Sequence, residues 1–188
     1  MSHPAWVCGL KLLRSIWLIL LLESHPAWVC GLKRDKRIKT TRVFEMTKES
    51  LDTYYDDLGT TLGEALLAPT RIYVKALKSI KNAGVKVKAC SHITGGGFYE
   101  NIPRMLKDGV KAVVEKDSYP VPPIFTKLAK EGNVDEHAMY NTYNMGIGMI
   151  VAVDPADVDK TIEAIKATGD TPYVIGHIED GEKGVTLC

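Results

Sequence analysis

The sequence predicts an α/β fold of the α+β kind, in which helices pack on a mixed sheet. The chain has 188 residues, of which 45% are hydrophobic and 25% charged, so it is in the globular range and long enough for one substantial core. From about residue 42, segments with the period of a strand alternate with segments with the period of a helix. The clearest unit lies near the end, where Asp154 and Pro155 begin a helix that runs to about Ala167, Gly169 ends it, and a strand follows at 173–178.

Apolar residues at helical spacing predict the other helices. In chain order their ranges are 43–55 with a loop at its end, 61–67, 72–82, 98–106, 124–131 and 136–143. Pro69 stops the second of these helices, Gly84 caps the third, and the PVPP string at 120–123 is a rigid entry to the fifth. Alternating or short apolar runs predict strands at 85–90, 112–114 and 148–153. Because strands and helices alternate, a sheet covered by helices is expected.

The first 41 residues are predicted to be a poorly specified extension before a domain at 42–188. The string SHPAWVCGLK occurs at 2–11 and again at 24–33. A repeat fold needs about three stacked units, so a duplication or a fault in assembling the reading frame is favoured. The uncharged run at 15–22 is shorter than the ~20 apolar residues of a membrane span, and no small-x-small cleavage pattern follows it. Membrane association is the minority alternative, and deleting residues 1–40 is expected to improve solubility or leave it unchanged.

Charge and cysteine content exclude several classes of function. Lys and Arg total 24 against 23 acidic residues, and the net charge of +1 gives no long-range field that favours nucleic acid or an anionic membrane. The cysteines form no CxxC pair and no Cys/His cluster with metal-ligand spacing. They are Cys8, Cys30, Cys90 and Cys188. The sequence therefore predicts a reduced, cytoplasmic chain without a metal site.

Three consecutive glycines, Gly95 to Gly97, stand between a predicted strand and a predicted helix. Glycine adopts positive φ without strain, so backbone N–H groups can converge there with the positive end of the helix dipole. Such a place holds a phosphate or a carboxylate. The alternative is a tight turn or a close contact between strand and helix, and the neighbouring His92 and Asn101 favour the anion site. Arg104 lies too far along the helix to contribute much to it.

Four strings together resemble the C-terminal half of one enzyme family. They are LGEALLAPTRIYVK at 62–75, HITGGGFYENIPRML at 92–106, SYPVPPIFTKLAKEGNVDEHAMYNTYNMGIGMIVAV at 118–153 and YVIGHIEDG at 173–181. The family is aminoimidazole ribonucleotide synthetase, also called phosphoribosylformylglycinamidine cyclo-ligase. The resemblance covers about 42–181, and HITGGG combined with NMGIGM is more specific than either string alone.

The resemblance implies an ATP-dependent ring closure that converts formylglycinamidine ribonucleotide to aminoimidazole ribonucleotide in purine biosynthesis. It also implies a substrate cleft between two α/β domains. Carried onto this chain, it makes His92 the catalytic proton donor or acceptor, with a satisfied structural histidine as the alternative of equal weight. The substrate or phosphate site would be formed by Thr94, Gly95, Gly96, Gly97, Asn144 and Gly146. For NMGIGM the alternative is a turn from helix to strand, in which Met145 and Met149 belong to the core.

The family holds Mg-ATP in an N-terminal domain that has no counterpart before residue 42 of this chain. Phosphoryl transfer depends on positioning and charge neutralisation, so the chain alone is expected to be inactive. Its expected partners are formylglycinamidine ribonucleotide and either a second copy or the missing ATP domain. The alternative function is a non-catalytic binding or scaffold module derived from the same domain.

Overall fold

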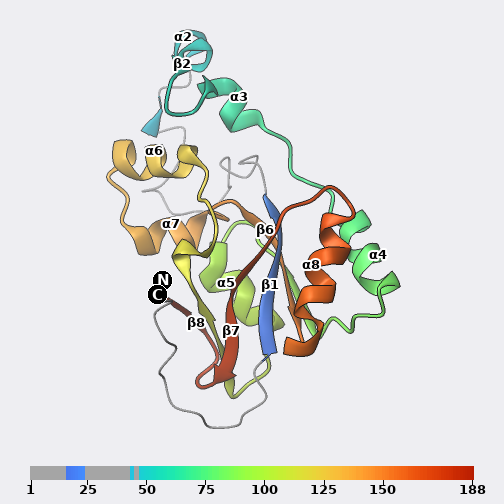
Figure 1. Ribbon diagram of the computed structural model, residues 1–188. Helices are drawn as coiled ribbons and strands as arrows, with labels where there is room; N and C mark the ends of the chain where they lie inside the picture. Colours follow the sequence, from blue (N-terminus) through green and yellow to red (C-terminus); the bar gives the residue numbers. More distant parts are fainter. Residues whose placement is uncertain (1–15, 24–42, 45–46) are drawn as a thin grey trace, which may run out of the picture.

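The computed structural model describes residues 16–23, 43–44 and 47–188, and its main feature is a six-stranded mixed sheet (Figure 1). The strands are β1 (Ile16–Glu23), β2 (Tyr54–Tyr55), β3 (Thr60–Thr61), β4 (Ala89–His92), β5 (Val110–Val114), β6 (Ile147–Val153), β7 (Pro172–Asp180) and β8 (Val185–Leu187). The helices are α2 (Lys48–Asp52), α3 (Leu62–Leu67), α4 (Val74–Asn82), α5 (Gly97–Met105), α6 (Pro123–Gly132), α7 (Glu136–Thr142) and α8 (Val158–Lys166), with short 3₁₀ turns η1 (Lys116–Ser118) and η2 (Pro155–Asp157).

The strands of the large sheet lie in the order β4-β6-β1-β7-β5-β8, and β2 and β3 form a separate hairpin. Every neighbouring pair in the large sheet is antiparallel except β5 and β8, which are parallel. Strand β6 is buried along its whole length. Its sequence, IGMIVAV, is a continuous apolar run, which is typical of a strand covered on both faces. The prediction of a mixed sheet is confirmed.

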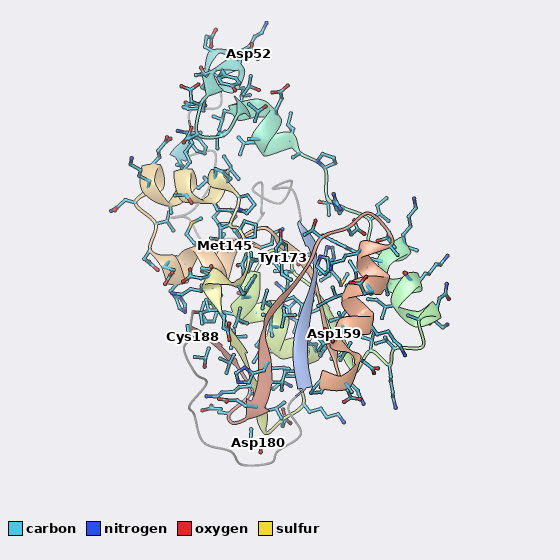
Figure 2. All side chains as sticks on the ribbon, viewed as in Figure 1. Asp52, Met145, Asp159, Tyr173, Asp180 and Cys188 are labelled. Atoms are coloured by element: carbon cyan, nitrogen blue, oxygen red, sulfur yellow. The ribbon has the colours of Figure 1, made fainter. Side chains whose placement is uncertain are left out.

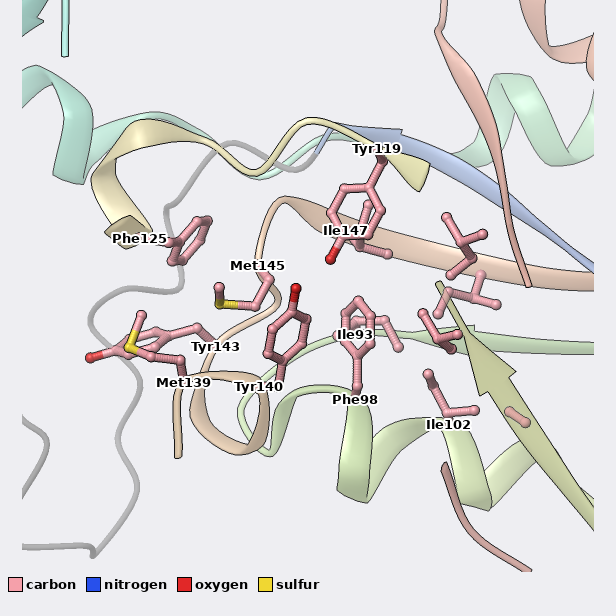
Figure 3. Close-up of a cluster of buried hydrophobic side chains, with 14 of the residues drawn as sticks. Ile93, Phe98, Ile102, Tyr119, Phe125, Met139, Tyr140, Tyr143, Met145 and Ile147 are labelled. Atoms are coloured by element: carbon pink, nitrogen blue, oxygen red, sulfur yellow. The ribbon is translucent and has the colours of Figure 1, made fainter. Parts of the chain in front are cut away.

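Two cores lie on opposite faces of the sheet. Along β6, Ile150 and Ala152 belong to one core, while Val151 and Val153 belong to the other, because successive side chains of a strand point to opposite faces. The first core contains side chains of α5, α6 and α7, and Figure 3 shows Phe98 beside Tyr140 and Tyr119 in it. The second core contains side chains of α4 and α8, which pack against each other. The result is a layer of helices on each side of the sheet.

The segment 16–23 was expected in a poorly specified extension, and the structure instead places it inside the sheet as β1. It pairs antiparallel with β6 on one side and with β7 on the other. Leu20, for example, is opposite Ile150 of β6 and Tyr173 of β7. An uncharged apolar run of this length is what a central strand requires. The duplicated strings at 2–11 and 24–33 lie outside the described residues.

Most predicted elements appear in the structure, with shifts at their ends. Of the predicted helix 43–55, residue 43 is helical, residues 45–46 lie outside the described residues, and α2 forms the later part. Thr47 begins α2 with a capping box, and α2 ends before the β2–β3 hairpin. The strand predicted at 85–90 pairs as β4 at 89–92, because its partner β6 ends at Val153 and Ala89 lies opposite Ala152. The short strand β8 was not predicted, since three residues carry too little pattern.

Candidate functional site

The glycine loop, residues 94–97, joins β4 to α5 and has an unusual backbone. Gly96 has φ +106° and Gly97 has φ +52°, and both values lie in the left-handed region that favours glycine. The N–H of Gly97 donates to the carbonyl of Thr94 at 3.0 Å, which closes the turn. The third glycine, Gly95, does not share the positive φ. The loop conformation therefore requires glycine at two of the three positions.

Gly97 also brings the loop against the end of α7. A Cβ atom added at Gly97 would lie 1.9 Å from the carbonyl oxygen of Tyr140 and 2.7 Å from that of Tyr143. A Cβ added at Gly95 would have no atom within 4 Å. The alternative of a close contact between elements is therefore realised at Gly97, whereas Gly95 is partly exposed and has open space at its Cβ position.

Backbone donors at the start of α5 differ in their exposure. Among the residues that the structure describes, the N–H groups of Gly95, Gly96, Phe98 and Tyr99 lie outside the hydrogen-bond ladder of α5. Gly96 and Phe98 are buried, whereas Gly95 and Tyr99 are partly exposed and can face a ligand. The N–H of Glu100 is used, because it donates to the carbonyl of Gly96 at 3.1 Å. Donors of this kind at the positive end of a helix are the chemistry that binds an anion.

An acidic side chain lies over the same loop. A Cβ added at Gly96 would be 2.7 Å from Oε2 of Glu100, so this carboxylate rests against the glycine backbone. Arg104 offsets part of the charge, with its Nη2 3.7 Å from Oε2 of Glu100. Arg104 thus interacts with its own helix, as expected from its distance along the sequence. The negative charge of Glu100 weakens the affinity of the loop for an anion.

Asn101 holds the loop in place. This buried side chain donates from Nδ2 to the carbonyl of Gly97 at 2.7 Å and to that of Thr94 at 3.3 Å. The hydroxyl of Ser91 donates to the backbone carbonyl of Asn101 at 2.9 Å, which ties β4 to α5. The sequence indicates Asn101 as a neighbour of the loop but does not indicate Ser91. The sequence signal for Asn101 was its spacing of four residues from Gly97, which is about one helical turn.

His92 lies on the other face of the sheet from α5. Its neighbours in the chain, Ser91 and Ile93, are buried toward α5, and the alternation of a strand turns His92 the opposite way. The ring of His92 is 5.7 Å from the ring of Tyr73 in an edge-on arrangement. Partial burial lowers the pKa of His92 below its ordinary value. The imidazole is therefore neutral at pH 7 and can accept a proton. However, it lies on the opposite face of the sheet from the first turn of α5.

The lowered pKa of His92 makes a prediction about pH. The unfolded chain binds this proton more readily than the folded chain, so the contribution of His92 to stability is present above about pH 6.5 and is lost as the pH falls toward the folded pKa. An NMR titration of the His92 ring protons should give a midpoint below that of the same residue in urea. A folded-state midpoint equal to or above the unfolded one would contradict the partial desolvation of the ring.

Asn144, Met145 and Gly146 form a tight turn between α7 and β6, here named the 144–146 turn. Met145 and Gly146 have φ of +50° and +94°. The side-chain oxygen of Asn144 accepts from the N–H of Gly146 at 3.0 Å, and its carbonyl accepts from the N–H of Ile147 at 2.8 Å. A Cβ at Gly146 would lie 2.4 Å from Cδ of Pro122. Met145 is buried in the first core (Figure 3).

The structure brings the two glycine motifs together. Gly97 of the loop contacts the carbonyl of Tyr143, the residue directly before the 144–146 turn. Figure 2 shows Met145 toward the α7 end of the sheet and Asp180 at the opposite end. His92 is the predicted site residue that points away from this pair of motifs, onto the face where Tyr73 lies.

The described residues contain neither a cluster of metal-ligating side chains nor a helix of membrane-spanning length. Within 16–23, 43–44 and 47–188, no group of three or more His, Cys, Asp or Glu side chains is placed to hold a metal ion. No helix in the described part of the chain is long and apolar enough to cross a membrane. Magnesium, which the resemblance implies together with ATP, thus finds no matching ligand set among these residues.

Comparison with curated proteins gives a consistent family. The phosphoribosylformylglycinamidine cyclo-ligase of Lachnospira eligens is 76% identical to this chain over 146 residues, and that of Agathobacter rectalis is 77% identical over 146 residues. Each alignment covers 78% of this chain and 43% of the relative. The chain therefore spans less than half the length of these relatives.

Solved structures agree on the fold. The thiamine-monophosphate kinase from Stenotrophomonas maltophilia has a TM-score of 0.60 and 16% identity, and the match covers 92% of this chain and 49% of the kinase. The hydrogenase maturation protein HypE of E. coli has a TM-score of 0.54 and 17% identity, with 99% of this chain and 49% of HypE covered. Identities this low establish a shared fold and nothing about activity.

The family itself follows from the sequence match. Residues 37–188 match the family model described as AIR synthase related protein, C-terminal domain. This range is well over half of the chain and contains both the glycine loop and the 144–146 turn. The chain therefore belongs to the AIR synthase related proteins, with residues 37–188 as the C-terminal domain of that family.

Proposed function

We propose that this chain supplies the substrate half-site of a phosphoribosylformylglycinamidine cyclo-ligase, which closes the imidazole ring of aminoimidazole ribonucleotide with consumption of ATP. The supporting observation is the contact of Gly97 with the carbonyl oxygens of Tyr140 and Tyr143, which sets the glycine loop beside the 144–146 turn. The two curated relatives described above carry the name of that enzyme. The high sequence identity to these two relatives favours a ligase over a scaffold module derived from the same family.

In this proposal the glycine loop binds the phosphate of the ribonucleotide. The N–H groups of the partly exposed residues Gly95 and Tyr99 are the donors, and the start of α5 adds its positive dipole end. The hydroxyl of Thr94 is a further candidate donor. Binding by a few backbone donors next to a carboxylate is expected to be weak, in the millimolar range.

Glu100 fits a different part of the same substrate. Its carboxylate lies over Gly96 and cannot favour a phosphate, but it can accept hydrogen bonds from an amidine, which carries N–H donors and is readily protonated. Asn144 and Gly146 shape the neighbouring wall, since the side-chain oxygen of Asn144 is already bonded to the N–H of Gly146. His92, neutral at pH 7, is kept as a candidate proton acceptor only for a group that reaches its face of the sheet.

The ATP step is assigned to a partner. The described residues offer no cluster of three metal-ligating side chains, so the ligands of Mg-ATP would come from the partner. Exposed apolar side chains at the end of α3, in the connection and at the start of α4 fit such a partner. They are Leu67, Ile72 and Val74, which are 78%, 83% and 52% exposed. The partner is an ATP-binding domain of this family or a second copy of the chain, and the proposed location of the assembly is the cytoplasm.

Phosphate titration followed by amide chemical shifts tests the loop. Shifts of Gly95, Gly96 and Phe98 should saturate at millimolar phosphate, and chloride at matched ionic strength should leave them in place. Gly96→Val should remove the response, because the side chain would enter the space between the backbone and Glu100. Unchanged shifts in the unsubstituted chain at high phosphate would reduce the loop to a structural turn.

A complementation assay tests the activity. The chain alone, with formylglycinamidine ribonucleotide and ATP, should form no product above a no-enzyme control. Addition of the separately expressed N-terminal part of the Lachnospira eligens relative should give ATP-dependent product, and Ile72→Asp should reduce it by weakening the association. If both parts are folded and no product forms, the ligase proposal is wrong and the scaffold alternative gains.

A further inference from the structure

The large sheet depends on a strand that lies outside the family match. The matched region begins at residue 37, whereas β1 ends at Glu23. β6 and β7 do not pair with each other, because β1 stands between them. Without β1, the described strands would separate into the pair β4–β6 and the group β7–β5–β8. The family domain in this chain therefore contains an open position in the middle of its sheet, and a segment from elsewhere in the chain fills it.

The walls of this position define what can enter it. On one side of the position lies β6, which is buried along its whole length. On the other side lies β7, in which Ile175 and Ile178 are buried. Helix α8 packs against β1 itself. A strand that enters this position has a neighbouring strand at each of its two edges. Its N–H and C=O groups must therefore form antiparallel hydrogen bonds with both neighbours. A proline or a charged residue in the strand would be costly there.

Residues 16–23 meet these requirements although they lie outside the matched region. The run IWLILLL contains neither a charge nor a proline, and Glu23 stands at its end. It is paired with β6 from Trp17 to Glu23 and with β7 from Ile16 to Leu21, with one irregularity between Leu18 and Ile19 on the β7 side. Backbone pairing on both sides requires an extended apolar segment, but it does not require a particular sequence.

We propose that the position between β6 and β7 is a strand-acceptor site, which takes an uncharged extended apolar segment antiparallel to both walls, and that Ile16–Glu23 of the same chain is its occupant. The proposal does not rest on the proposed ligase activity. It reverses the expectation for the N-terminal region, since removal of residues 1–40 takes away a central strand. It also makes the exact identity of the apolar residues in β1 unimportant compared with their ability to form an uninterrupted strand.

Two matched variants of the full chain test this selectivity. The double variant Ile19→Pro/Leu20→Pro removes one N–H toward each neighbouring strand, because successive residues of a strand direct their N–H groups to opposite sides. The triple variant Leu18→Val/Leu20→Val/Leu22→Val keeps an apolar strand former at each position. Their common readout is hydrogen exchange at amides of β6 and β7, which report the opening of the sheet on either side.

The proline variant should lose protection by about a hundredfold or more at β6 and β7, while the valine variant should stay within about tenfold of the unsubstituted chain. Unchanged protection in the proline variant would show that β1 is not the occupant. Equal loss in the valine variant would show that the site selects a sequence and not a strand. Either result overturns the proposal.

Disulfide trapping tests the position without relying on destabilised variants. In a background in which every native cysteine is replaced by serine, the register pairs Leu20→Cys/Ile150→Cys and Ile19→Cys/Val151→Cys are oxidised. At least one should close within a monomer, because directly opposite residues have Cα atoms about 4.5–5.5 Å apart. The control Leu20→Cys/Thr186→Cys should not close, because β7 and β5 separate β1 from β8 and three strand spacings amount to about 14 Å. No disulfide in either register pair, or a disulfide found only between two chains, would contradict an occupant from the same chain.

Discussion

Gly97→Ala should destabilise the domain by about 3 kcal/mol or more, which is among the largest effects expected for the loss or gain of a single methyl group. The added Cβ would lie 1.9 Å from the carbonyl oxygen of Tyr140, and both atoms belong to backbone that cannot move independently. The φ of +52° adds about 1 kcal/mol of strain for any residue with a Cβ. The loop and the end of α7 must therefore separate, which also moves the 144–146 turn that follows Tyr143.

Gly95→Ala is the matched control in the same loop. A Cβ at Gly95 meets no atom within 4 Å, so its free energy of unfolding should change by less than about 1 kcal/mol. Urea denaturation measures the stability of both variants, and the two midpoints can be compared directly when the m-values are equal. Equal stabilities of the two variants would mean that the loop does not rest against α7.

Asn101→Leu should cost about 2–4 kcal/mol although it keeps a side chain of similar size. The substitution removes the donor to the carbonyls of Gly97 and Thr94 and leaves these acceptors next to an apolar group. Because Asn101 is buried, water does not readily replace the lost hydrogen bonds. The carbonyls of the glycine loop would then be free to turn, so phosphate binding at the loop should weaken together with stability.

Arg104→Ala separates the buried part of this network from its exposed part. Arg104 donates to the side-chain oxygen of Asn101 at 3.3 Å, but its side chain is 67% exposed, so its loss should cost less than about 1 kcal/mol. Thermal or urea unfolding gives the stabilities, and amide shifts of Gly96 and Gly97 report the loop. A larger loss for Arg104→Ala than for Asn101→Leu would show that the loop is held from the surface and not from the core.

Sequence reasoning predicted part of the backbone conformation of the glycine loop, but not the direction of the side chains around it. Glycine at 96 and 97 indicated a positive-φ turn, and this follows from the absence of a Cβ at those positions alone. The position of His92 on the opposite face depends on the register of β4 against β6, where His92 lies opposite Met149. A shift of one residue in that pairing would turn His92 to the other face, and no local pattern in four residues specifies it.

The carboxylate over the loop was also beyond sequence reasoning. Glu100 is four residues after Gly96, but a helical side chain of that kind can extend toward solvent or fold back, and the missing Cβ of Gly96 leaves the space that it occupies here. Likewise, Ser91 contacts Asn101 only because β4 and α5 pack against each other. Contacts between elements depend on their docking, which propensities and periods do not describe.

The sequence by itself determined the class of the fold, the ends of most helices, the two glycine turns and the family, because each of these follows from local backbone preferences or from short strings of residues. The tertiary structure alone decided that 16–23 is the central strand. A run of seven apolar residues followed by Glu23 reads equally as a buried strand or as part of a poorly specified or membrane-associated extension. Its role depends on the unpaired edges of β6 and β7, which are more than a hundred residues away in the chain and become neighbours only when the helices on both faces are in place.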